Sequence, residues 1–191
     1  MSRLTYITSG ESHGQYLAAV IEGLPSGVSV DLDGINQELA RRQLGFGRGG
    51  RMVIEKDTVQ ITGGFWRGKT TGAPLQFLLK NADFKIDSMP DLYRPRPGHA
   101  DLVGALKYNQ HIRPILERAS ARETSMRVAV GTACRQLLRV FGIEVISHVL
   151  QIGKVVSKAE SWPYEKIVKL KKGSEMNCAD RDAEKKMILE I

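Results

Sequence analysis

The sequence predicts an α+β protein built from a β-sheet layer and a helix layer. Up to about residue 80, short alternating or apolar stretches are separated by Gly and Pro, which is the pattern of strands and turns. Beyond about residue 100 the apolar residues recur at three- and four-residue spacing, which is typical of amphipathic helices. Of the 191 residues, 42% are hydrophobic and 26% charged, so the chain has an ordinary globular composition and can form one sizeable core or two small ones.

The first strands are expected close to the N-terminus. Residues 3–8 alternate as a strand does, and residues 27–32 are a further candidate that follows a Pro/Gly turn. Residues 16–24 (YLAAVIEGL) suit either a buried strand or a helix, and periodicity alone leaves both open.

A helix is expected over residues 31–47. Asp33 would cap its start and Gly45 would stop it. Its apolar positions are Ile35, Leu39 and Leu44.

Strand signals return after this helix. Residues 51–64 predict a hairpin that turns at Lys56–Asp57, and residues 73–80 predict one more strand. Residues 87–101 contain three prolines and a glycine, so we expect an irregular loop there.

Two helices should follow, over residues 100–109 and 120–142. Ser120 and Glu123 have the spacing of a capping box at the start of the second, and Gly142 would end it. A buried stripe is expected at Met126, Val130, Ala133, Leu137 and Phe141.

The last part of the chain mixes charges of both signs. Residues 143–153 predict a strand and residues 179–191 a helix. This helix shows its spacing through Ala183, Met187 and Ile191. Because the pattern runs to the final residue with no Gly or Pro to end it, we expect the 191 residues to be part of a longer protein.

The net charge and the cysteine content limit which partners and which cellular compartment we expect. The formal charge of +7 suggests an anionic partner without saying which. Cys134 and Cys178 form no C-x-x-C pair or disulfide framework, and no apolar run approaches the ~20 residues of a membrane span. We therefore expect a cytoplasmic protein with no membrane association.

The segment GESHG, residues 10–14, fits the G-x-S-x-G pattern of a hydrolase nucleophile. In hydrolases that motif follows a central strand and an upstream oxyanion loop, and here too few residues precede Ser12 to supply either. His13 is the stronger candidate, because Gly10 and Gly14 let the backbone turn sharply and present it on a short loop after a strand. An imidazole also suits proton transfer near neutral pH. The alternative is that His13 is an ordinary turn residue.

A Gly/Arg loop, residues 41–51, carries four arginines and four glycines. Glycines let a backbone wrap an anion, and guanidinium groups bind carboxylate or phosphate at two points. A solvated basic loop without a ligand explains the composition equally well, and a nucleic-acid-binding module is a further alternative. Against nucleic acid, Phe46 is the only aromatic residue in this loop.

The segment RPRPGHAD, residues 94–101, is stiffened by Pro95 and Pro97. It holds Arg96 close to His99, which suits binding of an anion beside a proton donor, although a stiff surface connector is the alternative.

The start of the helix near residue 120 is a further anion candidate, reinforced by Arg118 and Arg122, although a capping box needs no ligand to explain it. No set of residues has metal-ligand spacing, so we predict no metal site. Together the motifs indicate a proton-transfer enzyme that acts on a small polyanion.

Five segments of this chain resemble chorismate synthases. GESHG, RRQLGFGRGGRM, GKTTGAPL, RPGHADLVGALKY and RASARETSMRVAVG occur in that family's order and near its spacings. The resemblance implies a β-α-β sandwich fold and a lyase of the shikimate pathway. Such a lyase eliminates phosphate in a 1,4-fashion with anti geometry from 5-enolpyruvylshikimate 3-phosphate to give chorismate. It also implies reduced FMN without net redox change, NADPH in bifunctional members, a homotetramer and a cytoplasmic location.

The resemblance also implies roles for individual residues. His13 and His99 would be the catalytic histidines, protonating the reduced flavin and the departing phosphate. Arg42, Arg48, Arg51, Arg96 and Arg122 would bind the substrate, the first two being linked to NADPH as well. Ala119, Ser120 and Ala121 match part of the FMN-contacting segment.

The chain departs from the family pattern in three ways. Ala119 stands where a second serine is usual, and the stretch 108–118 is one residue short and contains Pro114. The family's chains are about twice as long, and their second half carries further flavin loops and an aspartate proposed as a base. Residues 1–191 are thus expected to be the N-terminal part of a single domain without its C-terminal half, and inactive alone.

Overall fold

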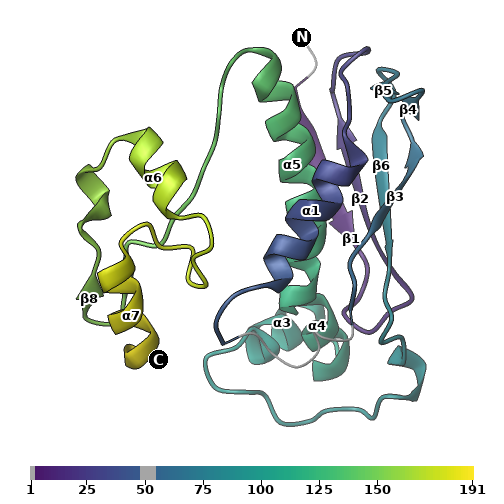
Figure 1. Ribbon diagram of the computed structural model, residues 1–191. Coiled ribbons are helices and arrows are strands. Elements are labelled where there is room, and N and C mark those ends of the chain that lie inside the picture. The colour runs from purple at the N-terminus through teal and green to yellow at the C-terminus, as the bar shows by residue number, and fades with distance from the viewer. Residues whose placement is uncertain (1–2, 48–54) are drawn as a thin grey trace.

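A four-stranded antiparallel sheet forms one layer of the molecule (Figure 1). The computed structural model describes residues 3–47 and 55–191. Its strands are β1 (Thr5–Ser9), β2 (Tyr16–Glu22), β6 (Leu75–Lys80) and β3 (Val59–Gly63), in the spatial order β1-β2-β6-β3. The stretch 16–24, for which strand and helix were both open, therefore forms a strand.

One face of the sheet is buried and forms one side of the hydrophobic core. In the register of β2 and β6, Leu17 pairs with Leu79 and Ala19 with Phe77, so these side chains point to the same face. All four are at most 1% exposed.

Helices α1 (Leu32–Gln43) and α5 (Thr124–Val140) cover that face and pack against each other (Figure 1). Ile35 and Leu39 of α1 are fully buried, and α5 contributes Met126, Val130 and Ala133. The prediction of an α+β protein with sheet and helix layers is confirmed.

A pair of short helices, α3 (Asp101–Tyr108) and α4 (Ile112–Arg118), lies at the lower end of the layers in Figure 1. The sequence patterns did not predict α4, which contains Pro114. This proline is the third residue of the helix, within the first turn, where the missing N–H costs no intrahelical hydrogen bond. A 3₁₀ turn, η2 (Ala121–Glu123), then leads into α5. Another, η1 (Ile86–Ser88), follows β6.

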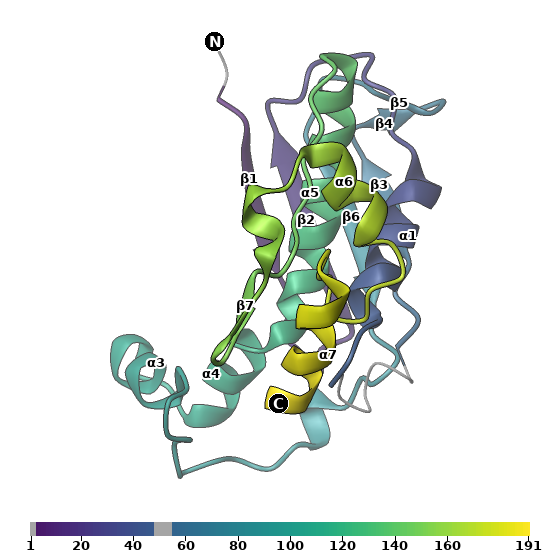
Figure 2. The same ribbon diagram turned by 60° about the vertical axis from the view of Figure 1, so that its left-hand side comes forward.

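The C-terminal part lies on the side of α5 away from the sheet, as Figure 1 and Figure 2 both show. It comprises a two-stranded hairpin of β7 (Gln151–Ile152) and β8 (Val155–Val156), a 3₁₀ turn η3 (Lys158–Ser161), and helices α6 (Tyr164–Leu170) and α7 (Arg181–Glu190). Two small clusters of buried residues, around Ile167 and Met187, hold it together. The predicted C-terminal helix is confirmed, although Ile191 is 69% exposed.

Two strand predictions are wrong. Residues 27–32 form only an isolated bridge, from Ser29 to Lys69, because this segment runs beside the small hairpin of β4 (Phe65–Trp66) and β5 (Lys69–Thr70) without a continuous ladder. In residues 143–153 only β7 is a strand, since the preceding residues connect two parts of the fold and pair with no strand described here.

Several helix details also differ from expectation. Asp31, not Asp33, caps α1, and its side chain accepts a hydrogen bond from the Gly34 N–H at 3.0 Å. Leu44 is 69% exposed because α1 ends one residue earlier, and Phe141, which is 71% exposed, directly follows Val140, the last residue of α5.

The capping box forms only in part. The Ser120 hydroxyl accepts from the Arg122 N–H, but the Glu123 carboxylate bonds Thr8 and Arg127 instead of turning back to Ser120. Of the predicted hairpin 51–64, residues 51–54 lie outside the described part of the chain, and β3 pairs with β6. Within the described ranges, no helix is both long and apolar enough to cross a membrane.

Candidate functional site

His13 lies in the tight turn between β1 and β2, and Gly10 makes this turn possible. Gly10 has φ +107°, and a Cβ at this position would lie 2.5 Å from the Tyr16 carbonyl oxygen, so only glycine fits. The sequence-based expectation of a sharp glycine turn that presents His13 is therefore met at Gly10. Gly14 needs no such conformation, since its φ is not positive.

A buried carboxylate holds His13. The backbone N–H of His13 donates to Glu117 Oε2 at 2.9 Å, and the imidazole Nδ1 lies 2.9 Å from the same oxygen. The Glu117 side chain is fully buried, whereas that of His13 is 17% exposed. On the other side of the ring, Nε2 lies 3.5 Å from Asp83 Oδ2. His13 is thus placed between two carboxylates.

Neither Glu117 nor Asp83 was among the residues singled out from the sequence. Glu117 directly precedes the segment RASARET, and the helix that carries it was not predicted. A buried glutamate in a short helix leaves no periodic signal, because its burial depends on a partner 104 residues away in the chain.

Ser12 is 2% exposed, and its backbone N–H donates to the Glu117 carbonyl oxygen. A serine nucleophile must be accessible to its substrate, so the buried position argues against the hydrolase interpretation of this motif.

Two of the predicted arginines meet at one buried aspartate. Arg122 Nη1 donates to Asp57 Oδ1 at 2.6 Å and Arg42 Nη2 donates to Asp57 Oδ2 at 2.7 Å. Arg122 Nη2 also lies 3.4 Å from Glu55 Oε2 without hydrogen-bond geometry. These opposite charges compensate one another in a region with little solvent.

The same network reaches the loop that carries His13. Arg122 Nε donates to Asn81 Oδ1 at 2.9 Å, and Asn81 Nδ2 donates to the Gly14 carbonyl at 2.6 Å. The structure therefore joins two of the sequence motifs, although Arg42 and Arg122 are paired with carboxylates rather than directed at open solvent. The other two predicted arginines of the Gly/Arg loop, Arg48 and Arg51, lie outside the described residues.

A second histidine–carboxylate group forms at the start of α3. His99 Nδ1 lies 2.6 Å from Oδ1 of the buried Asp101, which also accepts from the backbone N–H, Nε and Nη2 of Arg96 at 2.9–3.0 Å. The hydrogen bond from Arg96 is the main reason why the pKa of Asp101 lies far below its usual range, and the same pair raises the pKa of Arg96. Arg96, predicted to bind substrate, is here an ion-pair partner of Asp101 with half of its side chain exposed.

Each of the two predicted catalytic histidines is associated with one helix of the α3–α4 pair. His99 precedes α3, while His13 is held by Glu117 of α4. The two helices approach closely at Gly104, where a Cβ would lie 2.3 Å from Cγ2 of Ile115. Each imidazole has its own carboxylate partner.

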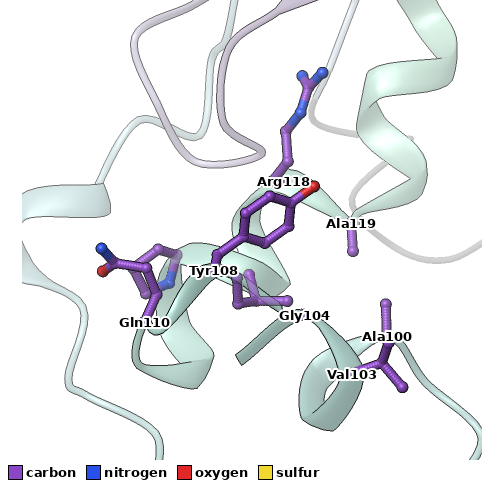
Figure 3. A pocket seen from close by; sticks show the side chains of 9 residues that line it. Ala100, Val103, Gly104, Tyr108, Gln110, Arg118 and Ala119 are labelled. Atoms are coloured by element: carbon purple, nitrogen blue, oxygen red, sulfur yellow. The ribbon is translucent and has the colours of Figure 1, made fainter. Parts of the chain in front are cut away.

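An open pocket of about 710 Å³ lies between α3 and α4 (Figure 3). Ala119 and Gly104 line it, and Figure 3 shows the Tyr108 ring at the same space. The Arg118 side chain lies at the edge, where Nη2 donates to the Thr8 carbonyl. A flat ring system with a polar rim fits a pocket with this mostly apolar lining, so the residues around Ala119 are compatible with a flavin.

The other two predicted flavin contacts lie next to this pocket in the chain. Ser120 is half-buried and its hydroxyl accepts from the Arg122 N–H, while Ala121 is exposed at the start of η2.

By its fold, the chain is an α+β protein of the kind found in a crystal structure of chorismate synthase. The two superimpose with a TM-score of 0.79 at 34% sequence identity, over 100% of this chain and 53% of the other.

Sequence comparison agrees with the structural match. The family model for chorismate synthase matches residues 4–191. A chorismate synthase of Alkaliphilus metalliredigens is 50% identical over 97% of this chain and 52% of its own length. One from Caldanaerobacter subterraneus subsp. tengcongensis is 55% identical over 83% of this chain and 46% of its own length. The chain therefore belongs to the chorismate synthase family, and it spans about half the length of the relatives it matches.

Proposed function

We propose that this chain supplies the N-terminal part of a site that eliminates phosphate and the C6 proton from 5-enolpyruvylshikimate 3-phosphate to give chorismate, a step of the shikimate pathway. The observation that carries the proposal is the pairing of His13 with the buried Glu117, next to the Arg42–Asp57–Arg122 network, in a member of this family. A proton-transfer group beside arginines suits a substrate with two carboxylates and a phosphate.

In this proposal each histidine has one task. With Nδ1 bonded to Glu117, His13 would use Nε2, which lies 3.5 Å from Asp83 Oδ2, to exchange its proton. His99, whose Nδ1 is bonded to Asp101 and whose Nε2 lies 3.0 Å from Arg96 Nη2, protonates the leaving phosphate. Arg96, Arg122 and the arginines of the Gly/Arg loop, Arg42, Arg48 and Arg51, stabilise the substrate anions.

Reduced FMN, when bound, supplies electron density as the phosphate leaves, with no net redox change. Ala119, Ser120 and Ala121 would hold it beside the pocket of Figure 3. Arg42 and Arg48 would serve NADPH if flavin reduction is intrinsic. The active form would be a cytoplasmic homotetramer.

The experiment is a chimera. Residues 1–191 replace the N-terminal 52% of the Alkaliphilus relative, and phosphate release is measured with substrate and reduced FMN under anaerobic conditions. We expect the chimera to release phosphate and residues 1–191 alone not to do so. A folded chimera without activity would contradict the proposed function, and enzyme-like turnover by residues 1–191 would contradict the need for a C-terminal half.

The nucleic-acid alternative finds no support in the described residues. Arg41 Nε donates to Glu38 at 2.7 Å, so this arginine of the Gly/Arg loop is bonded to a carboxylate of its own helix. Steeply salt-dependent binding to duplex or single-stranded DNA would instead support the nucleic-acid alternative.

A further inference from the structure

We infer that Glu117 is a positioning residue that keeps a proton on Nδ1 of His13 and thereby reserves Nε2 for chemistry. The inference deepens the proposed function, since the role of His13 in catalysis rests on it. The structural part of the inference, namely which ring nitrogen of His13 carries the proton, can be tested without measuring catalytic activity.

The geometry at Glu117 is a two-point clamp. An ionised carboxylate can only accept, so when Glu117 is ionised both the backbone N–H and Nδ1–H of His13 donate to Oε2, each at 2.9 Å. Two bonds from one residue to one oxygen restrict the side-chain torsions of His13 as well as its protonation.

The clamp is itself held rigidly. The Glu117 side chain is fully buried in α4, and its other oxygen accepts from Arg113 Nη1 at 3.4 Å. The Glu117 backbone carbonyl accepts from the Ser12 N–H, so side chain and backbone of one residue hold two successive residues of the turn.

The opposite side of the ring explains why the clamp is needed. Nε2 lies 3.5 Å from Asp83 Oδ2, and the other oxygen of Asp83 lies 3.0 Å from Lys85 Nζ. A neutral imidazole could place its single proton toward either carboxylate, and free histidine favours Nε2. The shorter contact and the complete burial of Glu117 favour Nδ1 instead, because an unsolvated carboxylate gains more from a hydrogen bond than a partly exposed one.

The experiment reads the tautomer by ¹⁵N NMR on the 191-residue chain labelled at histidine. The chain has only four histidines, so His13→Gln identifies the signal. Above the pH at which His13 loses its charge, we expect a protonated-type shift at Nδ1 and an unprotonated-type shift at Nε2. The reverse pattern in the wild-type chain would overturn the inference, even if no Glu117 variant folds.

Variants separate hydrogen bonding from general stability. Glu117→Gln keeps an acceptor oxygen and should retain Nδ1–H, whereas Glu117→Ala should shift the proton to Nε2. Asp83→Asn should leave the tautomer unchanged, and so should Glu123→Gln, a matched control whose carboxylate bonds Thr8 and Arg127. An Nδ1–H form that persists in a folded Glu117→Ala variant would overturn the inference.

Kinetics in the chimera give a second readout. Glu117→Ala should lower kcat roughly 10- to 100-fold, the loss typical when the partner that orients a histidine at a metal site is removed, with a much smaller change in KM. Glu117→Gln should restore most of that loss. If the unaltered chimera is inactive while the tautomer is as expected, the proposed function fails and the role of Glu117 in positioning His13 stands.

Discussion

Asn81 joins Arg122 to the turn that carries His13: it accepts from Arg122 Nε at 2.9 Å and donates to the Gly14 carbonyl at 2.6 Å. Asn81 is 2% exposed, so no solvent can replace these bonds. The anion-binding and proton-transfer motifs of the sequence are therefore mechanically linked through one amide side chain.

Loss of that amide should destabilise the protein. Asn81→Ala leaves a buried guanidinium N–H and a buried carbonyl unpaired, and each unsatisfied group costs about 1–3 kcal/mol. We expect the free energy of unfolding, measured by urea titration, to fall by at least about 2 kcal/mol on the same scale. Gln37→Ala, an exposed change on α1, is the control. Equal stability of the two variants would contradict a structural role for Asn81.

Because Gly104 lies so close to Ile115, we expect even a methyl side chain at position 104 to lower the free energy of unfolding. A methyl group at position 104 would lie 2.3 Å from Ile115 Cγ2, so Gly104→Ala must separate α3 from α4. Overpacking of this kind costs about 1–3 kcal/mol, which thermal or urea unfolding can measure.

A matched control is available on α5. Gly131 is also helical, and a Cβ there would meet nothing within 4 Å, so Gly131→Ala should be neutral or stabilising by up to ~1 kcal/mol. If Gly104→Ala behaved like Gly131→Ala, the close approach of the two helices would be wrong.

The depressed pKa of Asp101 predicts a pH dependence of stability. Because the folded pKa lies below the unfolded value of about 3.9, the stabilisation is complete above that value and is lost as the pH falls toward the folded pKa. Asp101→Asn should thus be less stable than wild type near neutral pH, and the difference should shrink as the pH falls below 4. The measurement is urea unfolding at a series of pH values.

Asp33→Asn, an exposed change in the first turn of α1, serves as the comparison for Asp101. A gap between wild type and Asp101→Asn that stays constant down to acid pH would show that Asp101 does not stabilise the fold through its charge.

The two histidines should matter for turnover in the chimera. His13→Ala and His99→Ala should each reduce kcat by about 10²-fold or more, the contribution typical of general acid–base groups. His111→Ala, a change at the exposed N-cap of α4 where no side-chain capping bond is made, is the control. Near-normal turnover in either variant would remove that histidine from the mechanism.

Sequence patterns located the elements that have strong local signals. The strand Leu75–Lys80 and the helix Thr124–Val140 were predicted because their apolar residues repeat with the period of a strand or a helix. The spacing of the apolar residues could not assign residues 16–24 to a strand or a helix. A strand with apolar residues on both faces gives the same unbroken apolar run in the sequence as a buried helix. Pairing with β1 and β6 decided it.

The site was predicted only in part, for a similar reason. His13, His99, Arg42, Arg96 and Arg122 stand in motifs of Gly, Pro and Arg that mark unusual backbone and concentrated charge. Of their carboxylate partners, Asp101 stands in the segment RPRPGHAD, whereas Glu117, Asp83 and Asp57 stand in no such motif. A carboxylate becomes a partner of a histidine or an arginine only when folding removes water around both.

The sequence by itself determined the layered α+β class, the family, the glycine turn at Gly10 and the candidate histidines, because each depends on local conformation or on motifs read along the chain. Only the tertiary structure decided that Glu117 holds His13 and that Asp57 joins Arg42 to Arg122. These pairs are 104, 15 and 65 residues apart in the chain, and burial makes their hydrogen bonds strong.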